Sequence, residues 1–144
     1  MTTKLRYEGF QSLAKQINEN ACHFLCILSI AEEERERLEF DNSQIDLIEA
    51  IRISESKGWL RTSDFYVKNC LAILKYFTNK EWTRIKVEKL PATINGNEYT
   101  ECNYYNPTTK REHFTRRGFD TLNNSITRRD GYLRYYYIYK CEEN

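Results

Sequence analysis

The sequence predicts a single α+β domain, 1–144, in which N-terminal helices pack on a C-terminal antiparallel sheet. Apolar residues of the first half recur at helical spacing between capping residues. The second half instead alternates apolar and polar residues between turn signals. Helices followed by a run of strands indicate an α+β fold, because α/β folds alternate strands with helices. The chain holds only two Pro and five Gly, so its composition is not that of a linker or a disordered segment.

The first helix is expected to begin after the cap Asn20 and to run to about Leu38. A broad apolar face between positions 24 and 31 would pack on the rest of the domain. The charged stretch 32–37 that follows is interpreted as the solvated end of the same helix.

Two shorter helices are expected before the sheet. One would begin at the cap Ser43 and stop before Gly58. Its buried stripe would consist of Ile45, Ile48 and Ile51. The other would begin at the cap Asn69.

Four strands are expected in the second half, at 82–87, 98–105, 111–117 and 132–140. Turn signals at 95–97 (Asn-Gly-Asn) and 106–108 (Asn-Pro-Thr) separate the first three of them. Consecutive strands are therefore expected to pair with one another as an antiparallel meander.

The net charge and the cysteine content limit the partners and the cellular compartment that can be expected. Lys plus Arg is 22 and Asp plus Glu is 21, and a net charge of +1 disfavours nucleic acid and anionic membrane as partners. No apolar stretch approaches the length of a membrane span, and no export signal is visible. The five cysteines are scattered, without paired CxxC spacing, so reduced thiols and a cytoplasmic location are expected.

Cys22 is the first candidate for chemistry. With Asn20 as the cap, Cys22 falls in the first turn of its helix, where unpaired backbone N–H groups and the helix dipole favour a thiolate. The alternative is a buried, unreactive cysteine, because cysteine is among the most buried residue types and four others occur in the chain.

The chain has two histidines. His23 follows Cys22 on the helix, so the two side chains diverge, and its expected role is packing or a polar contact at the helix start. His113 lies in an expected strand beside Phe114, from which it could present a base to the thiol. Asp120 follows His113 closely and could orient the imidazole. A surface histidine with a loop aspartate is the alternative interpretation.

Gln16 precedes Cys22 by six residues. Its side-chain amide could stabilise an oxyanion together with the backbone N–H of Cys22. Gln11 is a less well placed competitor for this role. A solvated glutamine is the alternative.

Two other patterns are open to a functional interpretation. Cys22, His23, Cys26 and His113 have the residue types of a metal site, but their spacing fits no usual zinc pattern, so neither a metal nor another cofactor is expected. The stretch 108–129 holds six basic and two acidic residues close to tyrosines, which could bind an acidic partner or nucleic acid. Such basic residues are also typical of the wet face and loop ends of a sheet.

Several short segments spread over most of the chain carry a resemblance to one family. They are Gly9-Phe10-Gln11-Ser12-Leu13, the helix of Cys22, Lys57-Gly58-Trp59, Phe65-Tyr66-Val67-Lys68-Asn69, His113-Phe114 and Gly131-Tyr132-Leu133. On these segments the chain resembles a family of small uncharacterised proteins from phages, prophages and spirochaete plasmids. That family is itself similar to papain-type cysteine peptidases of the bacteriocin-leader-peptidase type.

The resemblance implies a papain-like architecture, with a cysteine at a helix start and a histidine on the following sheet. Carried over, it implies Cys22 as nucleophile, His113 as base, Asp120 as the residue that orients the base and Gln16 as oxyanion donor. The functional expectation is then a thiol hydrolase, a peptidase or amidase, that acts on a peptide or protein substrate.

The chain departs from the family pattern beside the thiol. Ala21 stands where the family commonly has Gly, and His23 and Phe24 crowd a position that active peptidases keep open. Phe65 replaces the cysteine of the family's usual Cys-Tyr-Val motif. A peptidase fold does not by itself establish peptidase activity. The alternative expectation is a phage-borne binding protein that has lost catalysis and inhibits a host defence enzyme, in an anti-CRISPR-type role.

Overall fold

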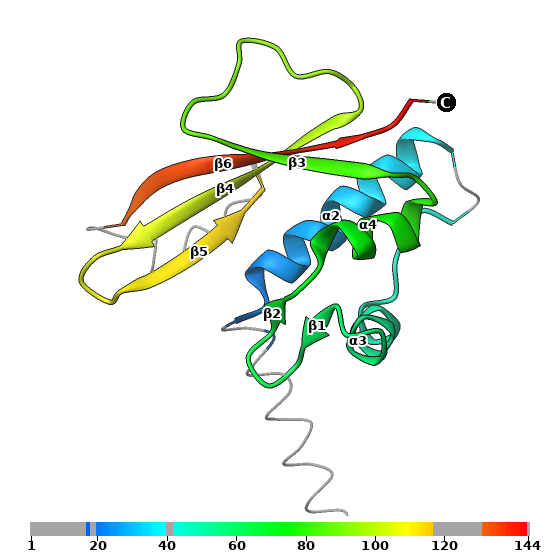
Figure 1. Ribbon diagram of the computed structural model, residues 1–144, viewed down its shortest axis with the longest axis horizontal. Helices are drawn as coiled ribbons and strands as arrows, with labels where there is room; N and C mark the ends of the chain where they lie inside the picture. The colour runs from blue at the N-terminus through cyan, green and yellow to red at the C-terminus, as the bar shows by residue number, and fades with distance from the viewer. Residues whose placement is uncertain (1–16, 18–19, 40–41, 117–130, 144) are drawn as a thin grey trace, which may run out of the picture.

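The computed structural model describes residue 17 and residues 20–39, 42–116 and 131–143 (Figure 1). The helical layer contains α2 (Cys22–Arg37), α3 (Leu47–Ser56) and α4 (Cys70–Thr78), with a small hairpin of β1 (Leu60–Arg61) and β2 (Tyr66–Val67) between α3 and α4. The main sheet contains β3 (Trp82–Val87), β4 (Glu98–Asn106), β5 (Arg111–Thr115) and β6 (Tyr132–Cys141). The predicted α+β class, with helices before an antiparallel sheet, is confirmed.

Side-chain caps set two of the helix starts. The side chain of Asn69 accepts the Ala72 N–H at 3.1 Å, which confirms the predicted start of α4. In α3 the cap is Asp46, which accepts the Glu49 N–H at 2.8 Å, so the predicted cap Ser43 is wrong.

The predicted cap of the first helix is also wrong. Asn20 has helical conformation, and Ala21 occupies the N-cap of α2 without a side-chain cap hydrogen bond. Cys22 is therefore the first residue of α2, as the prediction required, but no side chain caps the turn in which it lies.

The buried face of α3 also differs from the predicted stripe. Ile51 is buried, but Ile48 is 61% exposed and Ile45 precedes the helix. Because the helix begins at Leu47, its inward face passes through Ala50, Ile51 and Ile53.

The main sheet has the strand order β3-β6-β4-β5, and all neighbouring strands are antiparallel. The predicted hairpin at Asn106-Pro107-Thr108 joins β4 to β5. The predicted meander is wrong, because β6 lies between β3 and β4 and pairs with both. The connection 88–97 makes a wide excursion between β3 and β4, which leaves room for β6 (Figure 1).

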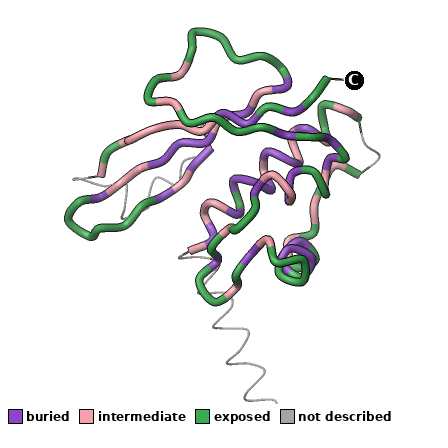
Figure 2. The backbone as a smooth tube through the Cα atoms, viewed as in Figure 1, coloured by how far each residue is buried: buried purple, intermediate pink, exposed green. Residues whose placement is uncertain are grey.

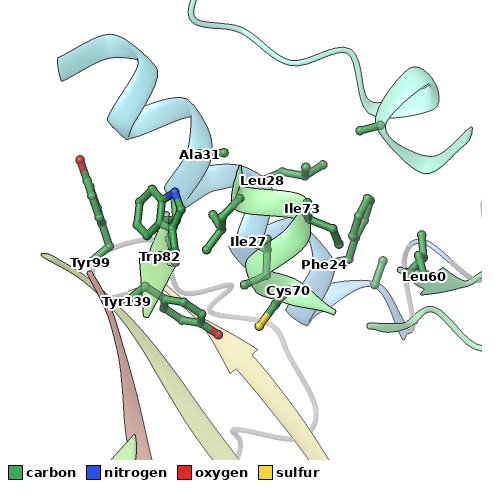
Figure 3. Packing of buried hydrophobic residues seen from close by; sticks show 14 of the residues in the cluster. Phe24, Ile27, Leu28, Ala31, Leu60, Cys70, Ile73, Trp82, Tyr99 and Tyr139 are labelled. Atoms are coloured by element: carbon green, nitrogen blue, oxygen red, sulfur yellow. The ribbon is translucent and has the colours of Figure 1, made fainter. Parts of the chain in front are cut away.

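The core lies where α2 and α4 cover one face of the sheet (Figure 2). Ile27 and Ile73 from the helices belong to this core together with Trp82 and Tyr139 from the strands, and all four are buried (Figure 3). Phe24 packs on Phe65, toward the side of Leu60. The β4–β5 hairpin and the beginning of β6 project beyond these helices (Figure 1).

A buried charge cluster joins α2 to the sheet at the other end of the helix. Glu34 is fully buried and accepts hydrogen bonds from Tyr99 Oη at 2.7 Å and from Arg37 at 2.7 Å to each oxygen, while Lys80 Nζ lies 3.2 Å away. Burial alone raises the pKa of Glu34, but the hydrogen bonds from Arg37, Tyr99 and Lys80 outweigh it and lower the pKa to about 2. The interpretation of 32–37 as a solvated helix end is wrong at Glu34.

Among the described residues, no helix combines the length and the apolar character that crossing a membrane requires.

Candidate functional site

A cleft of about 480 Å³ opens between the helical layer and the sheet, beside the start of α2. We call it the Cys22 cleft. Side chains from both layers line it: Asn20, Cys22, His23, residues 64–68, Cys70, Arg84, Arg111, Glu112, Phe114, Tyr135 and Tyr137. Aromatic rings and charged groups thus dominate its walls.

Cys22 lines the cleft, as the first residue of α2, but its thiol is not activated. Burial raises the pKa of Cys22 above its ordinary value, and the carboxylates of Glu101 and Glu112 raise it further. Hydrogen bonds from the backbone N–H groups of Phe114 and His23 act in the opposite direction but do not compensate. At neutral pH the sulfur is therefore a protonated thiol that joins the start of α2 to the edge strand β5.

His113 lies in β5, as expected, but not in the cleft. Its neighbours Glu112 and Phe114 both line the cleft, and successive side chains of a strand point to opposite faces. His113 is therefore buried on the other face of the sheet, where its register partner is Tyr104 of β4. The structure does not bring the predicted base to Cys22. The predicted Asp120 and Gln16, and the competitor Gln11, lie outside the described residues.

The histidine that the cleft does contain is His23. Its Nδ1 donates to Glu101 Oε2 at 2.6 Å, and its ring packs on Phe114 with centroids 4.4 Å apart. The other oxygen of Glu101 accepts the Tyr139 hydroxyl at 2.7 Å. His23 thus makes both the packing and the polar contact predicted for it, and it joins α2 to β4 and β5.

Sequence reasoning did not single out Glu101. It is fully buried in the middle of β4, where a carboxyl group would be costly without its two donors. Strand alternation could have indicated its position, because Glu101 shares a face of β4 with Tyr99, which lies in the core.

An aromatic wall runs along the sheet side of the cleft. The rings of Phe114 and Tyr137 are stacked at 6.4 Å, and Tyr135 meets Tyr137 edge-on at 5.2 Å. Arg84 lies over the Tyr137 ring at 4.2 Å. Across the cleft, Tyr66 of β2 is largely exposed.

The described arginines of the basic stretch 108–129 have two different roles. Arg111 lines the cleft. Arg116 is buried instead, where it donates to Glu33 at 2.6 Å, to Ser29 Oγ at 3.1 Å and to the Thr100 carbonyl at 2.8 Å. Arg116 therefore fastens the end of β5 to α2, and the basic residues between 117 and 129 lie outside the described part of the chain.

The possible metal site from Cys22, His23, Cys26 and His113 finds no support in the geometry. Among the described residues, which include these four, no three His, Cys, Asp or Glu side chains are grouped as metal ligands would be. His23 directs Nδ1 to Glu101, and His113 lies on the other face of β5.

Comparisons of the chain with protein-family models, with curated proteins and with solved structures find no match.

Proposed function

We propose that this protein is a small binding domain that holds a segment of a partner protein in the Cys22 cleft and has no thiol hydrolase activity. The observation that carries this proposal is the separation of Cys22 from His113 by the sheet. Nucleophilic cysteine catalysis needs a base within hydrogen-bond reach of the thiol, and His113 points away from it.

The state of the Cys22 sulfur supports the same proposal. A nucleophilic cysteine needs a lowered pKa or a neighbouring base, whereas burial and two carboxylates raise the pKa of Cys22. The other histidine, His23, follows Cys22 in sequence and is committed to Glu101 through Nδ1. The His23 Nδ1 and the Cys22 sulfur therefore both make contacts that hold α2 against the sheet.

The lining of the cleft suits binding. Tyr and Arg side chains are the residues most often found at the energetic centre of protein interfaces, and the walls hold Tyr66, Tyr135, Tyr137, Arg84 and Arg111. A volume of about 480 Å³ accommodates the side chains of a few consecutive residues of a peptide.

The resemblance to papain-type peptidases suggests how the helix of the cysteine and the sheet are arranged. A helix that begins at Cys22 beside a strand of an antiparallel sheet is compatible with that layout. We retain an anti-CRISPR-type inhibitor of a host defence enzyme as the hypothesis for the biological role, because the chain is small, the surroundings of Cys22 are crowded and the stretch 108–129 is basic.

Alkylation of Cys22 tests the proposal directly. The rate of iodoacetamide labelling at Cys22 should keep rising through pH 9, because the raised pKa keeps the thiol protonated below that pH. The measurement is peptide-mapping mass spectrometry at pH 6 to 10, with Cys22→Ser as the control. A labelling rate that is already maximal at pH 7, together with peptide hydrolysis that Cys22→Ala abolishes, would restore the thiol hydrolase.

Peptide binding should depend on the aromatic wall. Heptapeptides selected from a displayed random library are expected to lose affinity by about tenfold or more on Tyr135→Ala, because aromatic side chains at the centre of an interface contribute most of its binding energy. Tyr132→Ala is the matched control, since Tyr132 is an exposed tyrosine of the same strand outside the cleft. Fluorescence polarisation gives both affinities. Equal losses for the two variants would place binding elsewhere on the sheet.

A further inference from the structure

Arg84 of β3 lines the Cys22 cleft beside the aromatic wall. Its guanidinium carbon lies 4.2 Å over the centre of the Tyr137 ring, and its Nη1 lies 3.4 Å from the Cys70 sulfur. Lys68 lines the same cleft from the residues before α4. Among the described residues, neither Arg84 nor Lys68 forms an ion pair with a carboxylate.

The acidic side chains that line the cleft are neutralised within the fold. Asp64 accepts Arg61 at 2.7 and 2.9 Å, and Glu112 accepts Arg134 at 2.6 Å. Each of these two carboxylates is thus paired with an arginine, whereas Arg84 and Lys68 have no carboxylate partner among the described residues. These two cations therefore favour the binding of an anionic group.

From this arrangement we infer that the Cys22 cleft selects an acidic peptide segment, in which a carboxylate binds Arg84 and Lys68 and a neighbouring apolar or aromatic side chain packs on Tyr137 and Tyr135. The inference rests on the proposed function and adds the chemistry of the partner. A guanidinium is planar and presents paired N–H groups that match the two oxygens of a carboxylate, and the Tyr137 ring beneath Arg84 restricts where that group lies.

A peptide fits this cleft better than a single-stranded nucleic acid does. A nucleic-acid groove needs cations along the path of several phosphates, with few carboxylates beside them. Here Glu112 and Asp64 line the cleft together with the cations, and the net charge of the chain is only +1. Two cations beside an aromatic wall suit a peptide of mixed sequence that carries one acidic side chain next to an apolar or aromatic one.

Two matched peptide pools test the inference. Both are fluorescein-labelled hexapeptides with a fixed central Tyr-Glu or Tyr-Gln pair and random flanks, and the full chain is titrated into each. The Tyr-Glu pool should bind about tenfold more tightly, because a hydrogen bond to a charged group outweighs one to a neutral group. Arg84→Gln should bring the two affinities together, whereas Arg52→Gln, an exposed charge on α3 away from the cleft, should leave the difference intact.

Each outcome has a defined meaning. If both pools bind equally to the unchanged chain and Tyr135→Ala weakens both, the preference for a carboxylate is overturned while the binding function stands. If neither pool binds and peptides selected from a random library are insensitive to Tyr135→Ala, the proposed function fails as well. If a labelled oligothymidine displaces the Tyr-Glu pool, with an affinity that falls steeply with salt, the ligand is nucleic acid and the inference is overturned.

Discussion

Glu34→Gln is expected to lower the free energy of unfolding at pH 7 by about 3 to 5 kcal/mol, because it leaves a buried cation without its counter-ion. Lys80 is only 4% exposed and lies 3.2 Å from Glu34, so its ammonium cannot regain water without local opening. Arg37 is partly exposed and can turn to solvent. Urea unfolding followed by circular dichroism measures the loss. Glu36→Gln, at an exposed position of the same helix, should change stability by less than about 0.5 kcal/mol.

The same cluster predicts an acid limit of stability. The pKa of Glu34 is lowered to about 2 in the folded chain, below the ordinary value of 4.5. Its contribution is therefore complete above the unfolded pKa and is lost as the pH falls from about 5 toward 2. The unfolding midpoint of the parent chain should fall over this range more steeply than that of Glu34→Gln. Parallel curves for the two chains would show that other carboxyl groups control acid unfolding.

Glu101→Leu is the second substitution with a large expected effect, a loss of roughly 2 to 4 kcal/mol. Leucine approximates the volume of Glu101 but accepts no hydrogen bond, so the fully buried Tyr139 hydroxyl and the His23 Nδ1–H lose their acceptors. Because His23 is a wall of the Cys22 cleft, peptide affinity should fall together with stability.

A double-mutant cycle separates this network from a simple packing effect. Tyr139→Phe removes the donor that Glu101→Leu would strand, so the double variant should be more stable than the sum of the two single losses predicts, by about 1 kcal/mol or more. Losses that simply add would mean that the two side chains contribute independently.

Local sequence signals predicted elements better than they predicted pairing. The cap Asn69 and the turn at Asn106-Pro107-Thr108 act within a few residues, and both hold in the structure. The insertion of β6 between β3 and β4 depends on contacts between residues far apart in the chain, and no local pattern encodes it. Glu34 lies between these cases, because its spacing from Ile30 and Ala31 places it on the buried face of α2, although its charge suggested solvent.

The candidate site shows a similar division. The position of Cys22 in the first turn of its helix was predicted from the cap Asn20, and Cys22 is the first residue of α2 although the cap is Ala21. The face on which His113 lies depends on the parity of β5, and Phe114 beside it offered an equally good inward residue. Residue type favoured the histidine, whereas packing against α2 favoured the phenylalanine, whose ring contacts His23. Which alternate residues of a strand face the core can be decided only when the neighbours of that strand in space are known.

The place of β6 also constrains how the chain can fold during synthesis. Among the strands that the structure describes, β3 pairs only with β6, which begins at Tyr132, so β3 must wait for more than forty further residues to be made. Until then the helices can pack only on an incomplete sheet. The unpaired edges of β3 depend on the charged side chains of that strand to resist association with other chains. Completion of the sheet is therefore a late event, in which β6 pairs with β3 on one side and with β4 on the other.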